Sequence, residues 1–105
     1  MAIDSFEKQP WEKYWVSASF ANDLGDAESI VIGVSTVTAT DVNGDDATAD
    51  VITSGTASVD GQLLRVHVEA GTELLSPYKI TFRAATDSNP VNGWEKDVRM
   101  KVKEL

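Results

Sequence analysis

The stretch "QLLRVHVEA", residues 62 to 70, decides the fold class of this chain. Its apolar residues alternate with polar ones: Leu64, Val66 and Val68 against Arg65, His67 and Glu69. Side chains two residues apart point to the same face of a β-strand, so one face of this segment is apolar and the other polar. The pattern predicts a strand that packs on a core with one face and meets water with the other.

The same alternation continues on both sides of this stretch, in "YWVSASF" (14–20), "PYKITFRAA" (77–85) and "WEKDVRMKVKE" (94–104). Each of these segments predicts a strand with an apolar inner face. Lys79, Thr81 and Arg83 are expected to face outward. The expected core consists of Val16, Phe20, Ile30, Ile32, Leu64, Val66, Val68, Ile80, Phe82, Val98 and Met100.

Between the predicted strands at 14–20 and 62–70 the alternation of apolar and polar residues is less regular. In "SIVIGVSTVTAT" (29–40) the apolar parity switches near Ser35, which favours a bulge or a bend from one sheet to the other. "VNGD" (42–45) predicts a hairpin turn with Gly44 at positive φ. "ATADVIT" (47–53) predicts a short strand, and "SGTASVDG" (54–61) a loop with room for an edge strand.

No window of helical length carries an apolar stripe at helical spacing. Many short strands separated by turn residues are typical of an all-β sandwich. We therefore expect one domain, residues 1–105, with an immunoglobulin-like or fibronectin-like antiparallel β-sandwich of about seven strands. Residues 1–10 are expected to form an extended lead-in, in which Lys8, Gln9 and Pro10 run straight into the strand at 14–20.

The charge of the chain restricts its partners. Nine basic and 17 acidic residues give a formal net charge of -8, which disfavours nucleic acid and anionic membranes as partners. No cysteine is present, so no disulfide, thiolate nucleophile or cysteine metal site can form. The N-terminal segment has no apolar run of the kind that a signal peptide needs, so no signal peptide is expected.

Two features invite a catalytic or metal-binding interpretation. "DVNGDD" (41–46) resembles the start of a calcium loop, but Asp46 and Ile52 stand where the EF-hand pattern requires Gly and Glu. A polar turn is the better interpretation, with weak cation binding near Asp45, Asp46 and Asp50 left open.

His67 is the only histidine, and no nucleophile motif accompanies it. We expect no catalytic, cofactor or metal site and therefore no enzyme.

Three tryptophans remain: Trp11, Trp15 and Trp94. Trp94 begins the last strand and is expected to cover one end of the core. Trp15 has outward parity in its strand, and Trp11 shares that parity if it holds across the lead-in. These two side chains are the candidate partner-binding residues, by edge pairing of the strand together with aromatic burial.

The order of these features resembles a family of small tailed-bacteriophage proteins, the fiber-tail or tail adaptor proteins. The similarity covers about Lys8 to Glu104. The residues that carry it are Lys8, Pro10, Glu12, Tyr14, Gly25, Asp26, Ile30, Gly71, Thr72, Tyr78, Ile80 and Thr86. The resemblance implies a non-enzymatic structural role in a phage or prophage tail, with other virion subunits as partners.

The resemblance also implies a location in the virion, or in the cytoplasm of the bacterial host before assembly. An alternative is an Ig-like surface module that binds carbohydrate or protein. The sequence is compatible with an isolated chain that is a monomer.

Overall fold

The computed structural model describes residues 4–25, 28–88 and 90–104, so Asp26 lies outside the described residues. In these residues nearly all regular structure is β, which confirms the predicted all-β class. The elements are β1 (Asp4–Lys8), β2 (Tyr14–Ser19), the 3-10 turn η1 (Ile32–Val34), β3 (Thr36–Thr40), α1 (Thr48–Val51), β4 (Ser58–Asp60), β5 (Leu63–Val68), β6 (Tyr78–Ala85) and β7 (Gly93–Val102).

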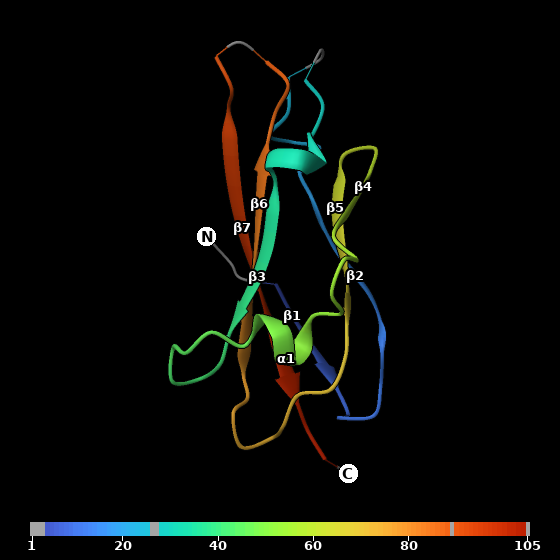
Figure 1. Cartoon of the computed structure of the whole chain (residues 1–105), viewed down its shortest axis with the longest axis vertical. Helices are drawn as coiled ribbons and strands as arrows, with labels where there is room; N and C mark the ends of the chain where they lie inside the picture. The colour runs from blue at the N-terminus through green and yellow to red at the C-terminus, as the bar shows by residue number, and fades with distance from the viewer. Residues whose placement is uncertain (1–3, 26–27, 89, 105) are drawn as a thin grey trace.

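The strands form two sheets that pack face to face (Figure 1). One sheet has the order β1-β7-β6-β3 and the other β2-β5-β4. All pairs are antiparallel except β1 with β7, which run parallel from Asp4 opposite Val98 to Lys8 opposite Val102. The expectation of a purely antiparallel sandwich is therefore wrong at this edge.

The core lies between the sheets and contains most of the residues expected there. Phe20, Ile30, Leu64, Val66, Val68, Ile80, Phe82, Val98 and Met100 are all buried. Val16 is only half-buried, since β2 is an edge strand, but it packs against the core. Thr81 was expected to face water and is instead buried, with its hydroxyl donating to Asp97 Oδ1 at 2.8 Å.

Ile32 does not belong to the core, and the prediction that it does is wrong. Its side chain is 44% exposed because residues 32–34 form the 3-10 turn η1 instead of a strand. The Ser35 hydroxyl stabilises this turn by donating to Val31 O at 2.7 Å and accepting from Ala85 N at 3.0 Å. The change of apolar parity near Ser35 therefore reflects a helical turn, not a bulge.

The predicted strand at 47–53 is also wrong, because its first half folds as the short helix α1. Ala47 N donates to Ala39 O at 2.9 Å, and Ala39 N donates to Thr48 Oγ1 at 3.0 Å. The helical turn carries Val51 into the core, where it is fully buried. Only Ile52 keeps a strand-like pairing, as an isolated bridge to Val68.

The sequence predicts an extended lead-in over residues 1–10, of which residues 1–3 lie outside the described residues. The described part is not extended throughout, so this prediction is wrong for its last residues. Asp4–Lys8 is a strand, but the chain then reverses in a turn in which Glu12 N donates to Gln9 O at 3.0 Å. Pro10 occupies the second position of this turn, where its fixed φ fits. The turn carries the chain from the four-stranded sheet to the three-stranded sheet.

Two other loops follow the sequence prediction. Residues 41–45 form a turn in which Gly44 has φ +86°, as expected, and Asp41 N donates to Asp45 O at 2.9 Å. An edge strand, β4, also forms in the predicted loop at 54–61.

The loop before β6 is tied to the core by Tyr78. The buried phenol oxygen accepts a hydrogen bond from Thr72 N at 3.0 Å, six residues upstream. Gly71 lies against this ring with φ +88°, and a Cβ placed on it would meet Val102 Cγ2 at 2.9 Å. The loop therefore requires glycine at this position for both backbone and packing reasons.

Candidate interaction surface

Trp11 lies in the turn that joins β1 to β2, and its side chain is 83% exposed. The turn itself is held firmly, since Glu12 Oε1 accepts from Gln9 N at 2.6 Å in addition to the backbone bond across it. The Lys13 ammonium lies 5.4 Å from the centre of the Trp11 ring. Trp11 is thus a large apolar side chain in water on a well-defined backbone.

Lys8 supports this turn from inside. The residue is only 2% exposed, and its ammonium donates to Gln9 O and Glu12 O, both at 2.9 Å. Burial lowers the pKa of Lys8 from its usual value, whereas the charges of Glu12 and Glu69 raise it. An ammonium group has three donor hydrogens, so the Lys8 side chain can bind both carbonyl oxygens at once and thereby stabilise the turn.

Tyr14 ties the other end of the turn back to β1. Its hydroxyl donates to Glu7 O at 3.1 Å, and its ring lies 5.9 Å from that of Phe6. Burial, and secondly the Glu12 carboxylate, raise the pKa of Tyr14. Lys8, Pro10, Glu12 and Tyr14, which the sequence picks out together, therefore cooperate in one local structure.

Trp15 lies on the outward face of β2 and is 49% exposed, in agreement with its parity. It stands opposite His67 of β5 in the strand register. The Arg65 guanidinium carbon lies 4.4 Å from the centre of the Trp15 ring, and the His67 ring meets it edge-on at 5.4 Å. These contacts hold the indole while leaving half of it in water.

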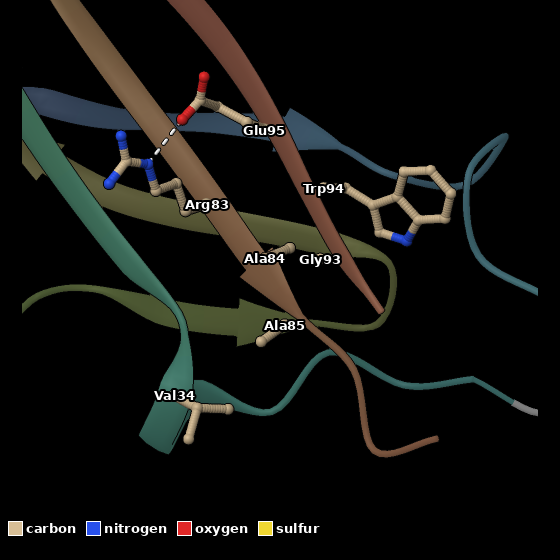
Figure 2. A pocket seen from close by; sticks show the side chains of 7 residues that line it. All are labelled: Val34, Arg83, Ala84, Ala85, Gly93, Trp94 and Glu95. Carbon is tan, nitrogen blue, oxygen red and sulfur yellow. Dashed lines mark hydrogen bonds and ion pairs between the residues drawn. The ribbon is translucent and has the colours of Figure 1, made fainter. Parts of the chain in front are cut away.

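Trp94 lies elsewhere, at the start of β7, and is 36% exposed. It was expected to cover one end of the core, but it is not among the buried core residues. Figure 2 shows its indole turned to the opposite side of β7 from the Arg83–Glu95 ion pair. Trp11 and Trp15 are thus the tryptophans with the larger exposed fractions.

Figure 2 also shows the residues that line a hollow beside Trp94. It has a volume of about 240 Å³, and its lining includes Val34 of η1 and the exposed Arg83–Glu95 pair at 2.6 Å. A second hollow, of about 490 Å³, is lined in part by α1 and the loop before β4, together with Asp46, which precedes α1, and Glu69, which follows β5.

His67 is half-buried on the outward face of β5. Its Nδ1 shares a hydrogen bond of 2.8 Å with Thr53 Oγ1, and its backbone N donates to Thr56 Oγ1 at 3.1 Å. Together with the Trp15 contact, these bonds give the ring a local structural role. The alternation of residues 62–70 predicted the outward position of His67 but not these contacts.

The carboxylates of Asp41 and Asp46 in "DVNGDD" are engaged in turn hydrogen bonds. Asp41 Oδ1 accepts from Asn43 N at 2.9 Å and from Asp45 N at 3.1 Å. Asp46 Oδ1 accepts from Thr48 Oγ1 at 2.7 Å and from Thr48 N at 3.0 Å, and these bonds lower the pKa of Asp46. Within residues 4–25, 28–88 and 90–104, no group of three or more His, Cys, Asp or Glu residues could hold a metal ion.

Glu28 is a structural residue that sequence analysis did not identify. Its carboxylate accepts hydrogen bonds from Gly25 N at 2.8 Å, Asn92 Nδ2 at 2.7 Å and Ser88 Oγ at 2.9 Å. These bonds lower its pKa to about 2, the Gly25 bond contributing most. No local sequence pattern links Glu28 to a loop 60 residues away.

Among the described residues, no helix has the length and apolar character needed to cross a membrane. Comparison with protein families, with curated proteins and with solved structures finds no match to this chain.

Proposed function

We propose that this protein is a non-enzymatic structural subunit that acts through protein–protein contacts, of the tail or adaptor type found in phages and prophages. The observation that carries the proposal is the exposure of Trp11 and Trp15, four residues apart, on a backbone fixed by the contacts of Lys8, Glu12 and Tyr14. Tryptophan contributes more to protein interfaces than most residues do, and a rigid support lowers the entropy that binding must overcome.

An Ig-like sandwich supports this role as the scaffold. In such domains the third, sixth and seventh strands are neighbours in one sheet, and the second, fifth and fourth strands are neighbours in the sheet that packs on it. The sheet orders β7-β6-β3 and β2-β5-β4 agree with that arrangement. The Tyr78 hydroxyl, which binds the backbone of Thr72, resembles the tyrosine corner at the start of the sixth strand of Ig domains.

The resemblance to tail adaptor proteins supplies the kind of partner: other subunits of a virion or tail. The protein would then occur in the virion, and in the host cytoplasm before assembly. Portal, capsid and tail genes beside its own gene would support this assignment. A neighbourhood of exported surface proteins would instead favour an Ig-like module that binds carbohydrate or protein.

The test uses the single variants Trp11→Ala and Trp15→Ala, with Trp94→Ala as a control outside the proposed surface. Each variant is measured for its melting temperature and for its ability to restore particle assembly in a phage that lacks the gene. We expect assembly to fall in the first two variants while their melting temperatures stay near that of the wild type.

Two results would contradict the proposal. If Trp11→Ala and Trp15→Ala both lose their fold, the tryptophans act in stability and the contact surface lies elsewhere. If both variants assemble like Trp94→Ala, these side chains have no part in docking. A glycan array tests the alternative function. If Trp11→Ala and Trp15→Ala bind glycans as strongly as the wild type does, these two tryptophans do not form a sugar-binding surface.

A further inference from the structure

β2 has an unpaired edge. Among the described residues, its one neighbour in the sheet is β5. Phe20 N donates to Gln62 O at 2.9 Å, just before the start of β5. The N–H and C=O groups of successive residues in a strand point to opposite sides. Those of Ala18, Val16 and Tyr14 therefore also point toward β5. The N–H and C=O groups of Trp15 and Ser17 point the other way. Within the part of the chain that the structure describes, these groups have no hydrogen-bond partner.

The outer edge of β2 is closed one step further along. Ser19 O accepts a hydrogen bond from Lys96 Nζ at 2.6 Å, and the same ammonium pairs with the Asp23 carboxylate at 3.1 Å. The open edge therefore comprises Trp15 and Ser17, which offer two donors and two acceptors.

The other edge strands are protected in ways that β2 is not. The outer backbone groups of Ala39 in β3 are covered by Ala47 and Thr48. β1 carries the exposed charge of Glu7, and β4 has only three residues and ends in Asp60. Charge, covering and shortness are the usual means of preventing edge pairing, whereas the six residues of β2 carry no charge.

We propose that β2 pairs with β2 of a second copy of this chain, antiparallel, about a twofold axis at Val16. Trp15 then lies opposite Ser17 of the other copy, and each such pair exchanges two hydrogen bonds. All the free groups of Trp15 and Ser17 are satisfied in both copies. An axis at Ser17 would instead need Ser19 O, which Lys96 already occupies.

The same register suits the inner side of the strand. Val16 lies opposite Val16, and Tyr14 lies opposite Ala18 of the other copy. Tyr14 and Val16 are half-buried in the single chain and gain burial from the added strand. Because β2 carries no charge, the pairing sets no like charges directly opposite one another despite the net charge of -8.

This inference goes beyond the proposed function, since it depends only on the edge of β2 and would hold equally for a surface module. A monomeric chain would overturn the inference and leave the assembly test of Trp11→Ala intact. Failure of that assembly test would in turn leave the dimer standing.

The first experiment is cross-linking with single cysteines, because the chain has none of its own. Val16→Cys places two thiols on a non-hydrogen-bonded pair with Cα atoms about 4.5 Å apart, within the range that a disulfide spans. The matched control is Ala18→Cys on the same strand and face, which lies opposite Tyr14. We expect a covalent dimer from Val16→Cys under mild oxidation and none from Ala18→Cys.

The second experiment is amide hydrogen exchange of the wild type across a concentration series, together with its sedimentation. We expect protection of the Trp15 and Ser17 amides to rise as the dimer forms. Ser17→Pro removes one of the two outward donors of β2 and should abolish the dimer. Ser5→Pro, at an outward-facing position of the edge strand β1, should leave it unchanged.

Several results would overturn the proposal. These are a wild type that stays monomeric with freely exchanging Trp15 and Ser17 amides, a dimer that survives Ser17→Pro, or equal cross-linking of Val16→Cys and Ala18→Cys. If Ser17→Pro does not fold, the exchange of the wild type decides the question by itself.

Discussion

Phe82 illustrates how a single residue supports the fold. Its ring is fully buried on β6, opposite Val37 of β3 and Lys96 of β7 in the strand register. Phe82→Ala should lower the free energy of unfolding by roughly 3–5 kcal/mol, because it removes buried apolar surface and leaves a cavity. Urea denaturation measures this change. The exposed neighbour Arg83 provides the control Arg83→Ala, and equal losses in the two variants would contradict the assignment of Phe82 to the core.

The alternation of apolar and polar residues largely predicts which strand side chains are buried, as Leu64, Val66 and Val68 show. It does so because side chains two residues apart lie on the same face of a strand. Lys8 shows the limit of such reasoning. Its parity in β1 is inward, but nothing local reveals that its ammonium meets the carbonyls of a turn that follows it. Contacts of this kind depend on the path of the chain after the strand ends.

At the scale of elements, two glycines with positive φ allow a matched comparison. Gly44 has open space around it, whereas a Cβ on Gly71 would meet Val102 Cγ2 at 2.9 Å. Gly44→Ala should therefore cost about 1–2 kcal/mol from backbone strain alone, and Gly71→Ala should cost more. Thermal unfolding of the two variants measures the difference. Equal melting temperatures would show that the loop before β6 moves freely to relieve the contact.

The loop at 41–46 should be indifferent to calcium. Asp41 and Asp46 already accept hydrogen bonds from their own turn, so binding a cation there would disrupt existing contacts. Millimolar calcium should leave the melting temperature of the protein unchanged. A large rise that EDTA reverses would contradict this expectation and restore the cation-binding interpretation of Asp45, Asp46 and Asp50.

The element that sequence analysis missed, α1, was hidden for a physical reason. Four residues are too few to display helical periodicity, and Val51 and Ile52 are β-branched residues that favour strands. What selects the helix is tertiary: Thr48 and Ala47 bind the backbone of Ala39 in β3. Ile32 was misplaced for a similar reason, since the Ser35 hydroxyl organises the turn around it.

At the scale of the whole molecule, stability should depend on pH through Glu28. The pKa of this carboxyl is about 2 in the folded protein and about 4.3 in an unfolded chain. The unfolded chain binds the proton first as pH falls, so the stabilisation is fully present above about pH 4.3 and is lost toward pH 2. The lowered pKa of Asp46 acts in the same direction.

Glu28→Gln tests this dependence, with Glu73→Gln as a control on an exposed loop. The melting temperature of Glu28→Gln should lie below that of the wild type at pH 6, and the gap should close as the pH approaches 2. A gap that stays constant down to pH 2 would mean that the charge of Glu28 does not contribute to its bonds with Gly25, Ser88 and Asn92.

The overall architecture followed from the sequence because several strands independently carry the same alternation, so single errors such as Ile32 did not alter it. The candidate surface followed only in part. The outward parity of Trp15 was visible in the sequence, but the turn that presents Trp11 depends on Lys8 and Glu12. The parallel pairing of β1 with β7 joins the two ends of the chain, and no local pattern encodes such a contact.

The contact of α1 with β3 also determines how far association can proceed. A ribbon of molecules grows without limit only when each member offers two docking edges, one for the molecule before and one for the molecule after it. Among the described edge strands, β3 is covered at Ala39 by Ala47 and Thr48, β1 carries charge and β4 has only three residues, so β2 is the edge best suited to docking. In the proposed dimer the short helix thus closes part of the β3 edge to further strand pairing, and the Thr48 hydroxyl is the side-chain group that does so.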